Sequence, residues 1–306
     1  MNRFTKYKRQ LQESAWLLGI CESGYDDLKA GRIHWIDNGE YKGKKWFADP
    51  FILDYNDELI TLLVEEFDYK VHRGRIAKLT IDRNNWTVTD CKIILDSDTH
   101  LSFPMIWRED NNVYVCPENN ASGALNLYVY HQESDSLAFV KLLINEKLTD
   151  SILYKDEKGY YVFSTCVPTP NGKTLTVYRA NNLAGDYKSE QKIRFSENIA
   201  RNAGMIFEYK GQLIRPAQEC NHTYGHAISF QTMRIDQNGF SFEEIFRYHS
   251  SHYGEFRYGT HTYNQHPHGM AVIDVKGFRY KKIGKWLWIL QQSLIKMHLK
   301  KEIWLQ

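Results

Sequence analysis

Paired cysteines, long apolar runs and a strong net charge are all missing from this sequence. Its five cysteines stand singly, with no Cys-x-x-Cys pair to bind zinc or form a redox site, so we expect a reduced, cytoplasmic protein. Residues 1–14 are polar and contain no apolar stretch of the kind that directs secretion. The formal net charge is +2, and no Lys/Arg-rich block lies beside stacking aromatics in the body of the chain. We therefore expect no nucleic-acid partner.

The chain is rich in aromatic residues, which make up 14% of its 306 residues, and hydrophobic residues make up 42%. This length allows one large domain or two modest ones with an ordinary hydrophobic core. Aromatic residues suit both β-sheets and sugar-binding surfaces, so composition alone does not separate the two. The arrangement of the residues along the chain is more informative.

A strand–turn–strand pattern recurs five times. Its anchor residues are separated by 54, 47, 53 and 57 positions, and they are Pro50, Pro104, Ser151, Gly204 and His261. From the anchor to the last residue of the second strand, copies two to four span 14 positions and the first copy spans 15. A regular period of this size is typical of repeat architectures.

Each copy predicts a hairpin of two short strands, and strand-like runs between copies supply two further strands. The sequence therefore predicts an all-β fold, a five-bladed β-propeller over residues 1–280. The last copy is too short for a whole blade, so we expect the early strand Trp16–Ile20 to complete it and close the ring. A β-sandwich is the alternative, and the equal spacing of the hairpins argues against it.

In a propeller the first strand of each blade lines the central channel, and the end of the second strand returns beside its start. Two sets of positions should therefore meet at one mouth. The strand starts are Asp49, Ser102, Asp150, Arg201 or Asn202, and His261; the strand ends are Glu65, Glu118, Thr165 and Gln218. Converging carboxylates are typical of acid/base sites for glycosidic chemistry. We predict catalytic roles for Asp49, Asp150, Glu118 and Glu65.

Other residues near the mouth are candidates for binding. We expect hydrogen bonds to sugar hydroxyls or a phosphate from Arg201, Arg215, Gln218, His222 and His261. We expect stacking on sugar faces from Trp46 and Phe103. The histidines lack a metal-ligand context, so we expect no metal and no cofactor. Alternatively, Asp49 merely caps a turn before Pro50 and Glu118 is an ordinary loop residue.

Several motifs carry a resemblance to a known family. They are Phe47–Phe51 (Phe-Ala-Asp-Pro-Phe), Gly-Arg-Ile at Gly74, Pro-Glu-Asn-Asn-Ala-Ser-Gly at Pro117, Arg-Pro-Ala-Gln at Arg215 and Gly-Thr-His at Gly259. Over roughly Trp16 to Tyr280 the chain resembles the propeller domain of plant glucosamine inositolphosphorylceramide transferases and its stand-alone bacterial relatives. That domain is similar in fold to the five-bladed glycoside hydrolases that include arabinanases and β-xylosidases.

The hydrolase resemblance implies residue roles. It implies that Asp49 is the base or nucleophile, that Asp150 tunes the acid, and that the general acid is Glu118 or Glu65. Blade two departs from the hydrolase pattern, because Ser102-Phe103-Pro104 offers no acid at its strand start.

The segment 281–306 differs from the rest of the chain. It has six lysines and one glutamate interleaved with large apolar residues. On a helix, Leu287, Leu290, Leu294 and Met297 share one face. This pattern predicts a basic amphipathic helix that lies on an anionic membrane surface and is too short and too charged to span it. The alternative is a helix packed on the flank of the propeller.

Together these features predict a carbohydrate-active enzyme on the inner face of the cytoplasmic membrane. Glycosyl transfer from a sugar donor to a glycan or lipid-linked acceptor is our first hypothesis. Hydrolysis of a furanoside or xyloside is the second, and a non-catalytic glycan-binding module is the third.

Overall fold

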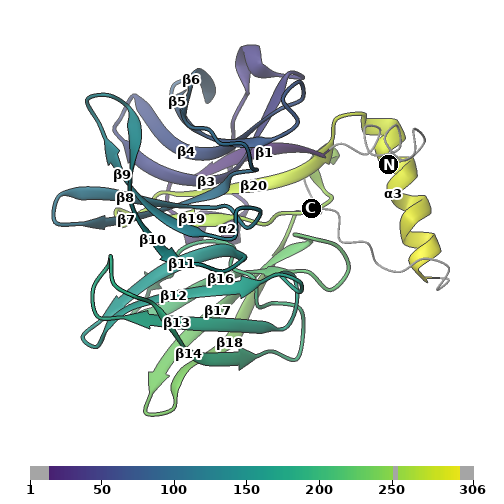
Figure 1. The fold of residues 1–306 in the computed structure, drawn as a ribbon. Helices are drawn as coiled ribbons and strands as arrows, with labels where there is room; N and C mark the ends of the chain where they lie inside the picture. The colour runs from purple at the N-terminus through teal and green to yellow at the C-terminus, as the bar shows by residue number, and fades with distance from the viewer. Residues whose placement is uncertain (1–13, 251–253, 297–306) are drawn as a thin grey trace.

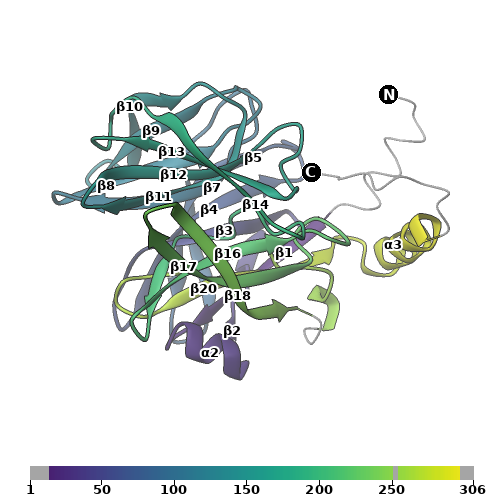
Figure 2. The same ribbon diagram turned by 90° about the horizontal axis from the view of Figure 1, so that it is seen from below.

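The computed structural model describes residues 14–250 and 254–296 and confirms the predicted five-bladed β-propeller. Five four-stranded antiparallel sheets are arranged around a central axis (Figure 1). Seen from below, the blades fan out on one side and the C-terminal helix lies at the edge of the propeller (Figure 2).

Three blades are continuous in the sequence. Blade 1 is β3 (Lys45–Tyr55), β4 (Leu59–Asp68), β5 (Gly74–Asp82) and β6 (Thr87–Leu95). Blade 2 is β7 (Ser102–Glu109), β8 (Asn112–Glu118), β9 (Leu125–His131) and β10 (Ser136–Ile144). Blade 3 is β11 (Leu148–Asp156), β12 (Gly159–Cys166), β13 (Thr174–Ala180) and β14 (Lys188–Arg194).

The last two blades complete the ring. Blade 4 is β15 (Phe207–Tyr209), β16 (Gln212–Glu219), β17 (Ala227–Asp236) and β18 (Gly239–His249). Blade 5 combines β19 (Tyr263–Gln265) and β20 (Ala271–Phe278) with β1 (Ser14–Cys21) and β2 (His34–Trp35). Because β1 pairs with β20 along its whole length, the predicted closure by an N-terminal strand is confirmed. Between β1 and β2 lies the short helix α2 (Tyr25–Ala30), and a 3-10 turn (Gly39–Tyr41) leads into blade 1.

The innermost strands of blades 1 to 3 share a β-bulge. In each, two residues oppose one on the second strand: Asp49-Pro50, Phe103-Pro104 and Asp150-Ser151. The first residue of each pair has a positive φ, between 42° and 49°. Bulges of this kind redirect side chains and are common beside functional sites.

The bulges also fix the equivalence of the blades. Glu65, Glu118 and Thr165 occupy matching positions, as predicted, because they pair with Ala48, Ser102 and Thr149. The residue that matches Asp49 and Asp150 is Phe103. The expectation that Ser102 matches them is therefore wrong by one position.

Neighbouring blades bury their faces against each other. In one contact, Phe163 of β12 packs edge-on against Phe240 of β18, with ring centroids 4.9 Å apart. Blades 4 and 5 approach so closely that a Cβ on Gly204 would lie 1.9 Å from the carbonyl oxygen of Tyr263. This packing holds the inner strands rigidly around the channel.

The helix α3 (Lys281–Lys296) follows β20. Its inner face packs on the propeller: Gly284 lies against Phe278, and Trp288 lies 5.3 Å from Tyr258 between ring centroids. Its outward face carries exposed apolar residues: Ile283, Trp286, Ile289 and Leu290. Of the predicted stripe, Leu290 is exposed and Leu287 is partly buried; the side chain of Leu294 and all of Met297 lie outside the described part of the chain. Within the described ranges, no helix has the length and apolarity needed to span a membrane.

Candidate functional site

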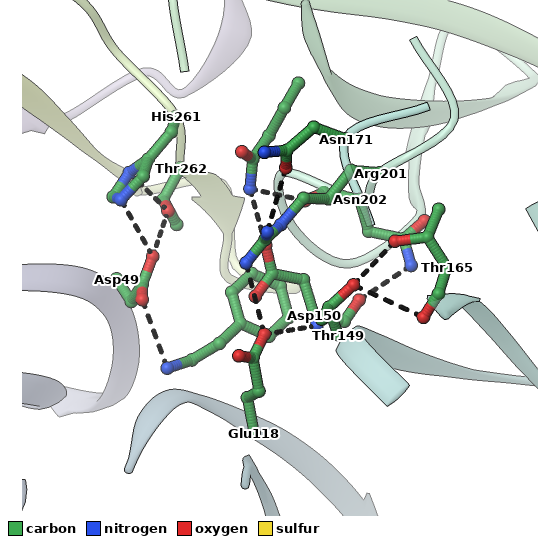
Figure 3. A network of polar contacts seen from close by, with 12 residues as sticks. Asp49, Glu118, Thr149, Asp150, Thr165, Asn171, Arg201, Asn202, His261 and Thr262 are labelled. Atoms are coloured by element: carbon green, nitrogen blue, oxygen red, sulfur yellow. Dashed lines mark hydrogen bonds and ion pairs between the residues drawn. The ribbon is translucent and has the colours of Figure 1, made fainter. Parts of the chain in front are cut away.

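The predicted mouth of the channel holds a group of buried polar side chains, contributed by all five blades. Six predicted site residues belong to it: Asp49, Glu118, Asp150, Arg201, Gln218 and His261. Figure 3 shows that the group has two halves, with Asp49 and His261 on one side and Asp150, Glu118 and Arg201 on the other. All six side chains are buried, with exposed fractions of 7% or less.

The first half is centred on Asp150. Its Oδ2 atom accepts hydrogen bonds from Arg201 Nε at 2.6 Å and from Gln218 Nε2 at 2.5 Å. Glu118 Oε2 accepts from the backbone N–H of Asp150 at 2.8 Å and from Arg201 Nη2 at 3.2 Å. Arg201 also donates from Nη1 to Asn171 Oδ1 at 2.9 Å. One guanidinium therefore holds carboxylates from two blades.

The two carboxylates of this half have opposite protonation tendencies. Burial and the charge of Asp150 raise the pKa of Glu118 well above its usual value. Burial also opposes ionisation of Asp150, but the Arg201 guanidinium and a hydrogen bond from Glu118 bring the pKa of Asp150 below its usual value. Near neutral pH, Glu118 is thus a candidate proton donor and Asp150 an ionised partner.

The second half is centred on Asp49. Its Oδ1 atom accepts from the hydroxyl of Thr262 at 2.6 Å, and its Oδ2 atom accepts from the backbone N–H of Phe103 at 3.1 Å. His261 Nε2 lies 3.6 Å from Asp49 Oδ1, while His261 Nδ1 lies 2.7 Å from Asp274 Oδ2. Trp16 stacks on the imidazole with ring centroids 3.9 Å apart. The imidazole is thereby fixed between two carboxylates.

Burial governs the titration of this half. It raises the pKa of Asp49 to about 7, although the nearby His261 opposes the shift. Burial would lower the pKa of His261, but the charges of Asp274 and Asp49 bring it to about 8. Both groups therefore titrate close to neutral pH, where a proton-transfer group works best.

Asp49, His261 and Asp274 offer ligand atoms that lie within 4.8 Å of one another. However, both carboxylate oxygens of Asp274 already accept hydrogen bonds. Its Oδ1 accepts from the backbone N–H groups of His261 and Thr262, and its Oδ2 accepts from that of Asp49. This arrangement favours a structural anchor for the imidazole over a metal ligand.

Among the described residues, Glu65 shares no hydrogen bond with either half of this group, although its charge helps to raise the pKa of Asp49. Its Oε1 atom is 3.1 Å from His100 Nε2, and His100 Nδ1 accepts from the backbone N–H of Gly74. The motif Gly-Arg-Ile at Gly74 thus has a local explanation, because a Cβ there would lie 2.6 Å from Glu65 Oε1. A catalytic role for Glu65 stays a prediction.

Several predicted binding residues have structural surroundings instead. Arg215 is fully buried and donates hydrogen bonds to Asn202, Gln231 and the carbonyl of Ala200, all in or beside blade 4. Its donors are therefore used within the protein, which corrects the prediction that Arg215 contacts a phosphate. Phe103 is also fully buried and packs against Phe51, so it offers no stacking face.

Two further predicted binding residues lie apart from the buried network. Trp46 is 8% exposed and is stacked against Phe67, with ring centroids 4.8 Å apart. This corrects the prediction that Trp46 stacks on a sugar face. His222 is exposed and lies beside His226, with ring centroids 5.4 Å apart. Its role in binding stays a prediction.

The sequence reasoning missed Asp274, Thr262 and Asn171. A signal for Asp274 exists, because it interrupts the apolar run Ala271–Val275, and a buried carboxylate in such a strand needs partners. Thr262 directly follows a predicted site residue. Asn171 lies in a loop, and no pattern distinguishes it from other loop asparagines.

Solved structures share the fold. A family 117 glycoside hydrolase from the marine bacterium Zobellia galactanivorans gives a TM-score of 0.52 at 9% identity, covering 87% of this chain and 91% of that one. An exo-β-1,3-galactanase from Phanerochaete chrysosporium with β-1,3-galactotriose gives 0.51 at 10% identity, covering 65% and 49%. At such identities the likeness concerns the fold alone.

Sequence comparison is more specific. Glucosamine inositolphosphorylceramide transferase 1 of Oryza sativa subsp. japonica is 29% identical over 188 residues, covering 59% of this chain and 25% of that protein. The protein of the same name from Arabidopsis thaliana is 27% identical over 197 residues, covering 62% and 26%. The chain thus spans about a quarter of the length of the curated relatives it matches. The family model for the N-terminal part of these transferases matches residues 37–290, so the chain belongs to the family "Glucosamine inositolphosphorylceramide transferase 1, N-terminal".

Proposed function

We propose that the channel mouth is a glycosyl-transfer site, at which a sugar from an activated donor is joined to a glycan or glycolipid acceptor. The observation that carries this proposal is geometric: Arg201 bridges Asp150 and Glu118, whereas Asp49 lies beside His261. Asp150 is held ionised by Arg201, whereas Glu118 and Asp49 both have raised pKa values. Pairs of carboxyl groups whose pKa values are pushed apart are typical of acid/base catalysis on sugars.

The roles follow from these pKa values. Asp49, with a pKa of about 7, accepts the proton of the acceptor hydroxyl as its oxygen bonds to the anomeric carbon. The bond from that carbon to the leaving group breaks with its electron pair. Glu118 supplies a proton to the leaving oxygen where one is needed. Asp150 and Arg201 hold Glu118 in place.

The helix α3 supports action at a membrane surface. Its exposed apolar residues and the exposed lysines 281, 282 and 285 together suit an interface between lipid head groups and acyl chains. The helix follows directly from β20, the strand that carries Asp274. The five cysteines are all free, in keeping with a reducing, cytoplasmic setting.

The test is mass spectrometry of lipid-linked acceptors incubated with nucleotide sugars. We expect an acceptor mass gain of one sugar residue, reduced at least 100-fold in Asp49→Asn and Glu118→Gln. Asp90→Asn is the matched control, because Asp90 is exposed on β6. Aglycone release from aryl furanosides or xylosides, with no acceptor gain, would instead establish a hydrolase.

A binding module is the second candidate. The observation in its favour is coverage: the relatives named as transferases are about four times as long as the matched region. Binding of a glycan without turnover of either kind of substrate would establish this alternative. The helix is tested separately by co-sedimentation with anionic phosphatidylglycerol vesicles, in which Trp286→Ser should weaken binding.

A further inference from the structure

Lys276 is a half-buried cation at the same mouth of the channel. It lies on β20 two residues after Asp274, so both side chains project from the same face of the strand. Trp16 is its direct partner across the β1–β20 pairing, and Trp16 stacks on His261. Lys276 is therefore next to the Asp49 half of the site.

The ammonium group of Lys276 lies beside two aromatic rings, and the Cys220 thiol is also near it. Its Nζ atom lies 5.5 Å from the ring centroid of Trp16 and 5.8 Å from that of Tyr224. Among residues 14–250 and 254–296, no carboxylate lies within ion-pair distance of Nζ and no acceptor forms a hydrogen bond with it. The ring of Tyr224 also lies 4.9 Å from Arg201 Cζ, so it is flanked by two cations.

The other cations of this region are already paired. Arg201 binds two carboxylates, Arg215 donates within blade 4, and His261 faces Asp274. A cation that is partly removed from water without a counter-charge is unfavourable, and burial accordingly lowers the pKa of Lys276 to about 8. An anionic ligand would remove this cost.

We infer that Lys276, flanked by Trp16 and Tyr224, is a phosphate-binding subsite at the channel mouth. This rests on the proposed function for its biological meaning, because a transferase of this kind handles phosphate in two places. One is the diphosphate of a nucleotide sugar, and the other is the phosphodiester of a lipid head group. Lysine binds either as a point charge.

Isothermal titration calorimetry on the full chain tests the subsite with two probes, uridine diphosphate and myo-inositol 1-phosphate. We expect at least one probe to bind, and Lys276→Met to weaken that binding about 10- to 100-fold. Lys276→Arg should keep most of the affinity. The probe that responds identifies the donor or the head group as the source of the phosphate.

Lys210→Met is the matched control, because Lys210 also lies over a tyrosine ring, 5.1 Å from the centroid of Tyr209, but in the β15–β16 turn. If Lys276→Met lowers the unfolding temperature, Lys276→Gln replaces it. Failure of both probes to bind, or equal affinity in the wild type and the Lys276 variant, overturns the inference. Asp49→Asn separates the two proposals, because it should reduce turnover at least 100-fold and leave phosphate binding intact.

Discussion

Asp49 and Asp150 occupy equivalent positions in blades 1 and 3, with the same bulge and φ values of 49° and 43°. Asp150 faces a guanidinium that belongs to blade 4, and its pKa is lowered. Asp49 faces a histidine that already has a carboxylate partner, and its pKa is raised to about 7. The repeat therefore places the two carboxylates, whereas the neighbouring blade decides whether each is ionised.

The largest effect should come from Arg201→Met, which removes the cation that distinguishes the two halves. Asp150 and Glu118 would then be buried together without a cationic partner, so we expect a loss of about 3–5 kcal/mol in the free energy of unfolding at pH 7. Urea denaturation measures this.

The control for that loss is Arg234→Met, which breaks an exposed ion pair with Glu243 and should cost less than about 1 kcal/mol. Equal losses in the two variants would show that the charge of Arg201 does not maintain the difference between the halves.

A second prediction concerns the pH dependence of stability. The pKa of Asp49 is higher in the folded state than in the unfolded chain, so its contribution is complete below pH 4 and is lost as the pH rises to about 7. Stability should fall by up to about 1.4 kcal/mol per pH unit across that window. Asp49→Asn should flatten this slope.

Asp150→Asn provides the opposite case. In the wild type the pKa of Asp150 is lower in the folded state than in the unfolded chain. The contribution of Asp150 to the free energy of unfolding is therefore present above the unfolded pKa of about 3.9 and is lost at lower pH. Parallel pH profiles for the wild type and Asp49→Asn, measured by thermal unfolding between pH 4 and 6.5, would contradict the assignment of Asp49 as the protonated member.

The sequence was sufficient for the repeat, the ring closure and most of the connected site, because strand patterns and equal spacing are local signals. Sequence-based prediction failed where contacts between residues distant in the sequence determine what a side chain does. Arg215 reads as a phosphate ligand in Arg-Pro-Ala-Gln, yet its donors are consumed inside the protein. The one-position error at Ser102 arose because a bulge inserts a residue without any sign in the composition.

Asp274→Asn should have a smaller effect than Arg201→Met. The amide would replace one carboxylate oxygen by a donor that faces either backbone N–H groups or the imidazole N–H. We expect a loss of about 2–3 kcal/mol in unfolding free energy. In the wild type, NMR of the His261 ring above pH 8, where the neutral imidazole predominates, should show the proton on Nδ1, and the variant should lose that preference.

The smallest effect should come from Thr262→Val, which removes one hydroxyl donor to Asp49 and keeps the side-chain shape. A hydrogen bond to a charged group is worth more than one to a neutral group, so the cost should be about 1 kcal/mol at pH 5.5 and about 1.5 kcal/mol at pH 8.5. Thr149→Val is the matched control in the other half, because Thr149 bonds to the hydroxyl of Thr165 rather than to a carboxylate. Its cost should be independent of pH. A pH-dependent cost in Thr149→Val, or a constant one in Thr262→Val, would mean that the titrating carboxylate of this mouth is not Asp49.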